Sequence, residues 1–137
     1  MGGPALINGV LIYEFDNFEY TPFTYKGKVW TTSEHAYQAS KFTDEKYIEE
    51  IRHASSGIEA WKLGQSTKYK IKTGFDRVQS MKQILREKFS IPRLRELLNR
   101  TTGYISFPGS DSFWGTCEGS GGQNVLGKIL MELRDNK

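Results

Sequence analysis

Three side chains in the segment 33–42 are of the types that carry out acid–base and amine chemistry. Glu34, Gln38 and Lys41 are four and three residues apart, so on a helix they lie within roughly 60° of one another. A carboxylate, which can exchange protons, would then share one face with an amide and with an amine, which can attack carbon. The same residues also suit a structural role, with Glu34 capping the helix and Lys41 solvated at its end. The two interpretations are compatible, because a capping carboxylate at the edge of a cleft is held rigidly.

A second segment of chemical interest is the glycine-rich stretch from Asp111 to Asn124. Seven of the fourteen glycines lie between Gly103 and Gly127. Glycine lets a backbone approach a ligand closely, and the start of a following helix attracts anions, so the stretch suits a phosphate. It lacks the glycine spacing of a dinucleotide-binding fold and the Gly-Lys-Ser/Thr of a P-loop. The structural alternative is a tight connection anchored by a buried Trp114.

The remaining reactive residues indicate no further centre. Cys117 is the only cysteine, which excludes an internal disulfide and a cysteine-based zinc site and fits an intracellular compartment, cytoplasmic or nuclear. His35 and His53 have no partner pattern for a catalytic triad or a metal centre, so we expect both to be structural. We therefore expect no metal and no cofactor.

The elements that would position these residues are mostly helical. Residues 5–30 are rich in aromatic and β-branched residues and predict short strands, with a hairpin at 25–30. The Thr31-x-x-Glu34 spacing matches a capping box and predicts a helix that runs to about Phe42. Caps and apolar spacing predict further helices over 44–51, over 58–63 with Gly64 as C-cap, over 76–89, from Pro92 and from Asn124. Residues 65–74 and 108–123 are predicted loops, and 104–107 a short extended piece.

Length and charge narrow the class of protein. The 137 residues, 37% of them hydrophobic, suit a single domain over 1–137, and no apolar run approaches the roughly 20 residues that cross a bilayer. The net charge of +3 is uneven, at −3, +7 and −1 for residues 1–45, 46–100 and 101–137. The basic middle could attract phosphates or simply form solvated helix faces. Its principal cations are Lys62, Lys68, Lys70, Lys72, Arg77, Lys82, Arg86, Lys88, Arg93, Arg95 and Arg100.

Several strings of the sequence match one known family. The most specific is Glu34-His35-Ala36-Tyr37-Gln38-Ala39-Ser40-Lys41-Phe42; others are Asp16-Asn17-Phe18, Gly27-Lys28-Val29-Trp30, Trp114-Gly115 and Asn124-x-Leu126-Gly127. Together they resemble the NADAR family, named for its link to NAD and ADP-ribose, over about residues 12–135. The resemblance implies a compact, mainly helical α+β domain with a small β-sheet. It also implies N-glycosidase activity, because family members hydrolyse phosphorylated riboflavin-pathway intermediates or remove ADP-ribose from the amino group of guanine in nucleic acid.

The resemblance also implies roles for individual residues. Glu34 would act as acid or base, and Asp111 would stabilise the cationic sugar or orient a ribose hydroxyl. Lys41 would offer a second route through a Schiff base, for which its pKa must be depressed. The implied substrate-binding residues are Asn17, Phe18, Tyr37, Gln38, Trp114, Gly115, Gly119, Gly121, Gly122 and Asn124. Among these, Tyr37 and Trp114 would cover a base or the sugar, and the loop 119–124 with the start of the last helix would hold phosphate.

The chain departs from the family pattern at two places. The Trp-Gly-Asp-Gly common in bacterial members is Trp114-Gly115-Thr116-Cys117, and a Trp found about eight residues before Met81 in many members is replaced by Thr73, with Phe75 the nearest aromatic residue. Any task of the missing acid is therefore absent or moved to another residue. The missing tryptophan concerns the stacking partner of the leaving group, and so the choice of substrate more than the type of reaction.

Three hypotheses of function follow. The leading one is a metal-independent hydrolase that removes ADP-ribose from guanine bases of DNA or RNA, since the basic middle segment suits a nucleic-acid substrate. The first alternative is an N-glycosidase of phosphorylated riboflavin-biosynthesis intermediates, and the second is a non-catalytic module that binds ADP-ribose or NAD. In each case we expect a monomer with no membrane partner.

Overall fold

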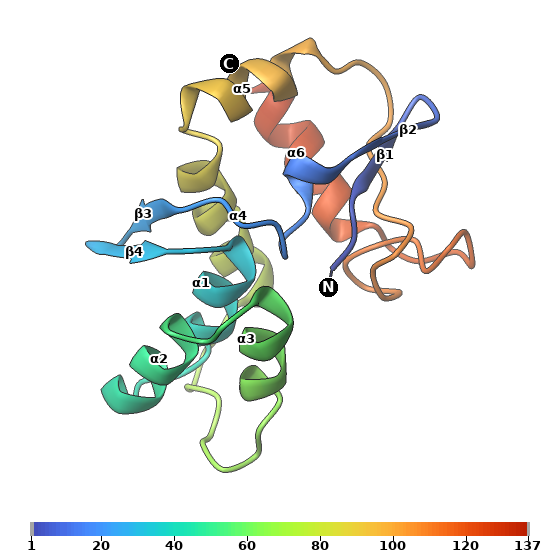
Figure 1. Cartoon of the computed structure of the whole chain (residues 1–137). Coiled ribbons are helices and arrows are strands. Elements are labelled where there is room, and N and C mark those ends of the chain that lie inside the picture. The colour runs from blue at the N-terminus through green and yellow to red at the C-terminus, as the bar shows by residue number, and fades with distance from the viewer. Residues whose placement is uncertain (1, 137) are drawn as a thin grey trace. The chain divides into compact units, whose positions relative to one another are not determined.

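The chain is built from helices and two short hairpins (Figure 1). The computed structural model describes residues 2–136, which form two compact units. One unit is Tyr20–Lys88, and the other combines the chain up to Glu19 with the chain from Phe89 onward. The described residues hold six α-helices and two antiparallel two-stranded sheets, which confirms the predicted α+β class. No helix within residues 2–136 is both long and apolar enough to span a membrane.

The Tyr20–Lys88 unit begins with the predicted hairpin. Strand β3 (Phe23–Tyr25) pairs with β4 (Lys28–Trp30), and Phe23 lies opposite Trp30. The two-residue turn, Lys26 and Gly27, has φ of 51° and 76°, the left-handed conformation that tight hairpin turns require. The Trp30 indole N–H donates to the Tyr25 carbonyl at 3.1 Å and ties the two strands together.

Four helices complete this unit: α1 (Ser33–Ser40), α2 (Glu45–Arg52), α3 (Gly57–Gly64) and α4 (Arg77–Lys88). Helix α1 packs against the other three. The side chains of Asp44, Ser56 and Asp76 each accept a backbone N–H from the first turn of the helix that follows, which satisfies donors that a helix start leaves open. The caps at Asp44 and Asp76 confirm the predicted starts of α2 and α4.

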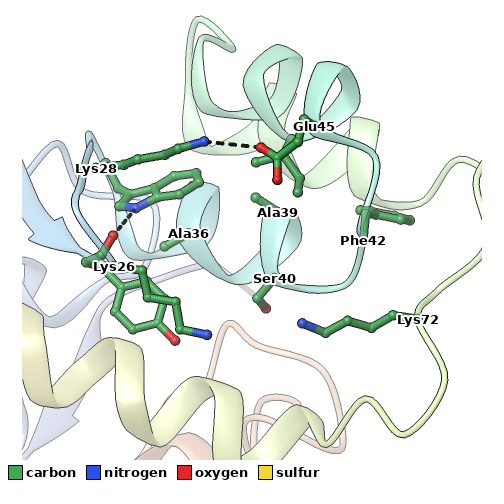
Figure 2. A pocket seen from close by; sticks show the side chains of 11 residues that line it. Lys26, Lys28, Ala36, Ala39, Ser40, Phe42, Glu45 and Lys72 are labelled. Carbon is green, nitrogen blue, oxygen red and sulfur yellow. Dashed lines mark hydrogen bonds and ion pairs between the residues drawn. The ribbon is translucent and has the colours of Figure 1, made fainter.

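The side of α1 formed by Ala36, Ala39 and Ser40 lines a pocket together with the β3–β4 hairpin (Figure 2). The small alanine side chains leave this space open beside Trp30 and Phe42.

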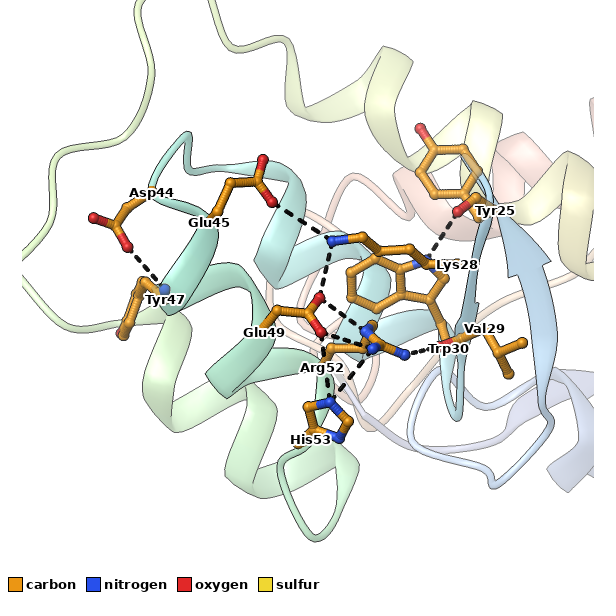
Figure 3. A network of polar contacts seen from close by, with 10 residues as sticks. All are labelled: Tyr25, Lys28, Val29, Trp30, Asp44, Glu45, Tyr47, Glu49, Arg52 and His53. Carbon is orange, nitrogen blue, oxygen red and sulfur yellow. Dashed lines mark hydrogen bonds and ion pairs between the residues drawn. The ribbon is translucent and has the colours of Figure 1, made fainter.

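An ion-pair network connects β4 to α2 (Figure 3). The Glu49 carboxylate accepts from Lys28 at 2.9 Å and from Arg52 at 2.7 Å and 2.9 Å. The Arg52 guanidinium also donates to the Val29 carbonyl. The hydrogen bonds from Arg52 and then Lys28 lower the pKa of Glu49 to about 2.

The second unit holds β1 (Ala5–Ile7), β2 (Val10–Ile12), the 3-10 turn η1 (Tyr13–Phe15), α5 (Pro92–Arg100) and α6 (Val125–Asp135). Strands β1 and β2 pair through a turn at Asn8 and Gly9, and Leu6 forms a bridge with Ser106. Pro92 opens α5 as predicted, since a proline costs nothing at the first helical position. The buried apolar side chains of this unit include Phe15, Phe89, Leu94, Leu98, Ile105, Phe107, Leu126 and Leu130.

Candidate functional site

Glu34 and Gln38 form a buried pair on α1, as their spacing predicts. The Gln38 amide nitrogen donates to the Glu34 carboxylate at 2.6 Å, and neither residue is more than 1% exposed. The pair lies against Gly64, the last residue of α3. A Cβ at Gly64 would stand 1.9 Å from the Gln38 amide oxygen, so only glycine lets the two helices come this close. A burial of this kind holds the carboxylate rigidly.

The expected capping box at Thr31 is wrong by one residue. Thr32 is the N-cap, and its hydroxyl accepts the backbone N–H of His35 at 3.1 Å. Glu34 therefore stands one position too early in the first turn to reach back to the cap, and its carboxylate binds Gln38 instead. The capping role proposed for Glu34 is thus replaced by a side-chain pair that faces the inside of the unit.

His35 is structural, as expected. Its ring is buried, with Nδ1 2.6 Å from the Thr32 hydroxyl and Nε2 3.0 Å from the Ala54 carbonyl. A carbonyl accepts only, so Nε2 donates and Nδ1 accepts from the hydroxyl. Burial lowers the pKa of His35, which favours this neutral ring.

Lys41 is half-buried at the end of α1, on the same side as Glu34. Its amine lies 3.4 Å from the Gly64 carbonyl and 5.6 Å from the centre of the Tyr37 ring. Burial lowers the pKa of Lys41, and the negative charge of Glu34 opposes the shift without cancelling it. A lowered pKa increases the neutral fraction of the amine, which is the form that attacks carbon.

The aromatic surroundings of Lys41 come from two elements. Tyr37 is 4% exposed, and its ring centre is 6.0 Å from that of Phe75, in the loop before α4. The Tyr20–Lys88 unit thus brings Glu34, Tyr37, Gln38 and Lys41 together. In the sequence, Phe75 stands out only as the aromatic residue nearest to Thr73, and the structure places it beside Tyr37.

Asp111 and Trp114 belong to the other unit. The Asp111 carboxylate accepts the backbone N–H groups of Phe113 and Trp114 at 2.9 Å and 2.8 Å, a local turn that aspartate commonly stabilises. Trp114 is 4% exposed, with its ring edge-on to Phe113, so it anchors this connection, and its role at a base or sugar stays a prediction. Asp111 is exposed, and its role at a sugar stays a prediction.

The glycines of the 111–124 loop serve two different purposes. A Cβ added at Gly115 would lie 2.2 Å from the Phe107 carbonyl oxygen, and one added at Gly122 would lie 2.3 Å from the Gly115 carbonyl oxygen. Close backbone packing therefore requires glycine at both positions. Gly119 and Gly121 have φ near +85° and open space around them. Among the four, only Gly119 and Gly121 keep the open backbone that a phosphate would need.

The start of α6 does not offer its first donors to a phosphate, contrary to the prediction. The backbone N–H groups of Asn124, Val125 and Leu126 donate to the carbonyls of residues 115, 113 and 114. The Asn124 side chain makes no capping hydrogen bond; it donates to the Tyr104 hydroxyl and the Ile105 carbonyl. Asn124 has φ of 53°, and this left-handed conformation turns its side chain away from the helix start. The position of the helix start was predicted correctly, but its first N–H groups already have carbonyl partners within the protein.

Asn17 and Phe18 also lie in the second unit. Asn17 is fully buried, and Phe18 is half-buried next to a turn in which its N–H donates to the Asp16 carboxylate at 2.8 Å. Their assignment to the substrate stays a prediction.

The prediction of a basic surface over residues 46–100 is wrong for Lys88. Lys88 is fully buried, with its amine 3.4 Å from the Ser33 hydroxyl, so it adds nothing to a phosphate-attracting surface. Arg93, Arg95 and Arg100 belong to α5 of the other unit. The exposed cations of the Tyr20–Lys88 unit are therefore Lys62, Lys68, Lys70, Lys72, Arg77 and Arg86 from that set. Residues 2–136 contain no group of three or more side chains that could together hold a metal ion.

Comparisons with known proteins identify the family. The model described as NADAR domain matches residues 11–136. The N-glycosidase YbiA of Escherichia coli (strain K12) is 40% identical over 127 residues, which cover 89% of this chain and 79% of that protein. A riboflavin biosynthesis protein of Vibrio vulnificus (strain YJ016) is 35% identical over 124 residues, covering 87% of this chain and 34% of that protein. The NMR structure of E. coli YbiA matches with a TM-score of 0.76 and 40% identity over 90% of this chain and 76% of that one.

The fold is of the α+β class, and its helix α1 brings the Glu34 carboxylate, the Gln38 amide and the Lys41 amine to one face. The chain belongs to the NADAR family. The names of its relatives support a glycosyl hydrolase of the N-glycosidase kind.

Proposed function

We propose that this N-glycosidase removes ADP-ribose from the exocyclic amino group of guanine in nucleic acid. The observation that carries the proposal is the α1 face, where a buried carboxylate held by an amide lies beside a half-buried lysine of lowered pKa. A module that only binds ADP-ribose has no use for this combination of groups.

Glu34 would handle the protons of the reaction. Breaking the bond between ribose C1 and the guanine nitrogen requires a proton on the leaving nitrogen and a nucleophile at C1. Glu34 is held by the Gln38 amide and lies close enough to Lys41 for its charge to affect the lysine pKa. We propose that it exchanges a proton with the group bound beside Lys41. Asp111 is proposed to stabilise the cationic sugar or to orient a ribose hydroxyl.

Lys41 would supply the nucleophile. A ribosylamine opens to an imine, and the neutral Lys41 amine adds to its C1 carbon. Loss of the guanine amine, which takes one proton, leaves an imine between Lys41 and C1. Water then adds to this imine and releases ADP-ribose and free Lys41, so that the net change is hydrolysis. Direct attack of water at C1, assisted by Glu34, is the competing route.

The nucleic-acid part of the substrate is supported by charge. Exposed lysines and arginines gather in the unit that also holds Glu34 and Lys41, and such cations attract phosphates. Tyr37 and Trp114 are proposed to cover the base or the sugar, and Gly119 and Gly121 to approach phosphate. The rest of the proposed substrate-binding set is Asn17, Phe18, Gln38, Gly115, Gly122 and Asn124.

A second candidate is hydrolysis of phosphorylated riboflavin-biosynthesis intermediates. The specific observation in its favour is that relatives from Vibrio vulnificus and Zea mays are named riboflavin biosynthesis proteins. The chain spans 34% and 19% of those two proteins.

One pair of assays separates the candidates. The protein is incubated with an oligonucleotide carrying ADP-ribosyl-guanine and, separately, with the phosphorylated ribosylaminopyrimidine of riboflavin synthesis, and release of the sugar product is followed. We expect release from the oligonucleotide. Release from the pyrimidine alone would establish the second candidate, and binding of ADP-ribose without turnover of either would establish a binding module.

The route is tested by borohydride trapping during turnover. We expect a covalent adduct in the wild type and none in Lys41→Ala. An adduct that persists in Lys41→Ala would reject Lys41 as the amine, and turnover without any adduct would favour direct attack of water.

A further inference from the structure

Helix α1 has a second face that lines pockets, opposite to the face that holds Glu34 and Lys41. At about 100° per residue, Ala36, Ala39 and Ser40 lie on the side of the helix away from Glu34, Gln38 and Lys41. Two pockets open on this side, with volumes of about 210 Å³ and 170 Å³. They share Tyr25, Lys26, Ser40 and Lys72, so they form one continuous groove. We call it the rear groove.

We propose that the rear groove binds single-stranded nucleic acid, with one unpaired base in the larger pocket and backbone phosphate between Lys26 and Lys72. This inference rests on the proposed function, since the strand would be the one that carries the modified guanine.

The larger pocket has the lining that an unpaired base needs. Trp30 and Phe42 flank the space that Ala36 and Ala39 leave open, and Ile48 adds a further apolar contact. Its volume is about 210 Å³, which is room enough for one base. A base paired in a duplex could not enter, so the pocket selects an unpaired one.

The rim of the groove has the charge that a phosphate needs. Figure 2 shows the Lys26 and Lys72 side chains extending toward the Ser40 hydroxyl. Both lysines are exposed, and within residues 2–136 neither forms an ion pair with an acid. The Ser80 hydroxyl donates to Ser40 at 2.8 Å and orders the hydroxyl between the two amines.

Two acids also line the groove, Glu45 in the larger pocket and Asp76 in the smaller one, and each has a partner within the protein. Glu45 lies 3.6 Å from the Lys28 amine, and Asp76 accepts the backbone N–H of Gln79 as the cap of α4. Lys28 itself is bound by Glu49, which raises the pKa of Lys28. Of the three lysines that line the groove, Lys26 and Lys72 are the two without an acidic partner in the part of the chain described, and the Lys26 amine lies 5.5 Å from the centre of the Tyr25 ring.

The rear groove leads to the face that holds Lys41. The Lys72 backbone N–H donates to the Lys41 carbonyl at 2.8 Å, so the backbones of these two residues lie side by side at the end of α1. Phe75 lines the smaller pocket, and its ring lies next to that of Tyr37, over which the Lys41 amine is placed. A strand that passes around the end of α1 thus meets both faces. A small metabolite bound at Lys41 would have no use for a second phosphate position behind the helix.

The test compares two substrates that differ only in the strand. Wild type and Lys26→Ala/Lys72→Ala are assayed on an ADP-ribosyl-guanine in a single-stranded DNA oligonucleotide and on the ADP-ribosyl-guanosine nucleoside. We expect the double variant to lose roughly tenfold in kcat/KM on the oligonucleotide, mainly through KM, and nothing on the nucleoside. The slope of log kcat/KM against log salt should become shallower by about 0.7 for each phosphate that the variant no longer neutralises.

The matched control is Lys46→Ala/Lys128→Ala, which removes the same charge from two exposed lysines that line neither pocket and do not belong to the basic set listed above. We expect it to keep most of the oligonucleotide activity and the wild-type salt slope. An abasic site beside the modified guanine should raise KM for the wild type. Equal losses in both double variants, equal losses on both substrates, or an unchanged salt slope in Lys26→Ala/Lys72→Ala would overturn the proposal.

A binding readout separates this proposal from the proposed function. Fluorescence anisotropy with an unmodified single-stranded DNA oligonucleotide needs no turnover. If the wild type binds it and only Lys26→Ala/Lys72→Ala binds it more weakly, the groove stands even when no ADP-ribosyl substrate is cleaved. If the wild type does not bind it, or both double variants bind it as tightly as the wild type, the groove is rejected even when turnover is found.

Discussion

Replacement of Gly64 by alanine would disturb the Glu34–Gln38 pair without touching either residue. The added methyl would lie 1.9 Å from the Gln38 amide oxygen and 2.6 Å from its Cδ, so the amide must move. Gln38 is 1% exposed, so it has little free space into which to turn. Overpacking costs about 1–3 kcal/mol, and losing a hydrogen bond to a charged group costs about 1.5–3 kcal/mol. Alanine is a better helix former than glycine by about 1 kcal/mol, so we expect a net loss of stability of about 1.5–5 kcal/mol.

The assay is urea unfolding of wild type, Gly64→Ala, Gln38→Ala and the double variant, together with kcat/KM. Gln38→Ala removes two of the three Gln38 atoms nearest to the new methyl. The double variant should therefore be more stable than the sum of the single losses predicts, by about 1 kcal/mol or more. Gly64→Ala with wild-type stability and activity would refute the reasoning, because the pair would then tolerate the displacement.

Three further predictions concern single charges. Asp111→Asn keeps an oxygen for the turn at Trp114, so unfolding should change by less than about 1 kcal/mol; if the charge acts on the sugar, kcat should still fall at least tenfold by activity assay. Because burial lowers the pKa of Lys41, the alkaline rise of kcat should lie below pH 10.5, and Lys41→Arg, which stays protonated, should abolish turnover. The lowered pKa of Glu49 means that its contribution to stability is present above pH 4.5 and is lost as pH falls toward about 2. The free energy of unfolding of Glu49→Gln should therefore depend less on pH in that window than that of the wild type.

Each of these has an outcome that contradicts it. Asp111→Asn with full activity would leave Asp111 only its role in the turn. A Lys41→Arg variant that still turns over would remove Lys41 as a nucleophile. An acid unfolding profile identical in wild type and Glu49→Gln would show that the network of Figure 3 does not contribute to stability in acid.

The helices were predicted where one local signal decides them. Asp44 and Asp76 cap α2 and α4 because their carboxylates accept N–H groups that the first turn of a helix leaves without a partner. Pro92 opens α5 because proline has no N–H that would need a partner there. The shared face of Glu34 and Gln38 also follows from helix geometry alone. These parts of the fold and of the candidate site required no knowledge of distant residues.

The predictions failed where packing between distant segments decides. Thr31 and Thr32 are both acceptable caps, and the backbone conformation of Thr32 selects the second. Gly64 is required by its contact with Gln38 and is not the left-handed C-cap that its position suggests, since Gln65 follows in helical conformation. The burial of Lys88 and the hydrogen bonds of the first N–H groups of α6 likewise depend on residues outside the local sequence.

The most direct test of the central claim is single-turnover release of ADP-ribose from a guanine oligonucleotide by wild type and by Glu34→Gln. Glutamine keeps the size of the buried side chain and removes the carboxylate that exchanges protons. We predict that release by Glu34→Gln is at least 100-fold slower, at the lower end of what proton transfer by a positioned group contributes, with unfolding changed little. Release at the wild-type rate by a folded Glu34→Gln would contradict the assignment of the α1 face as the catalytic centre.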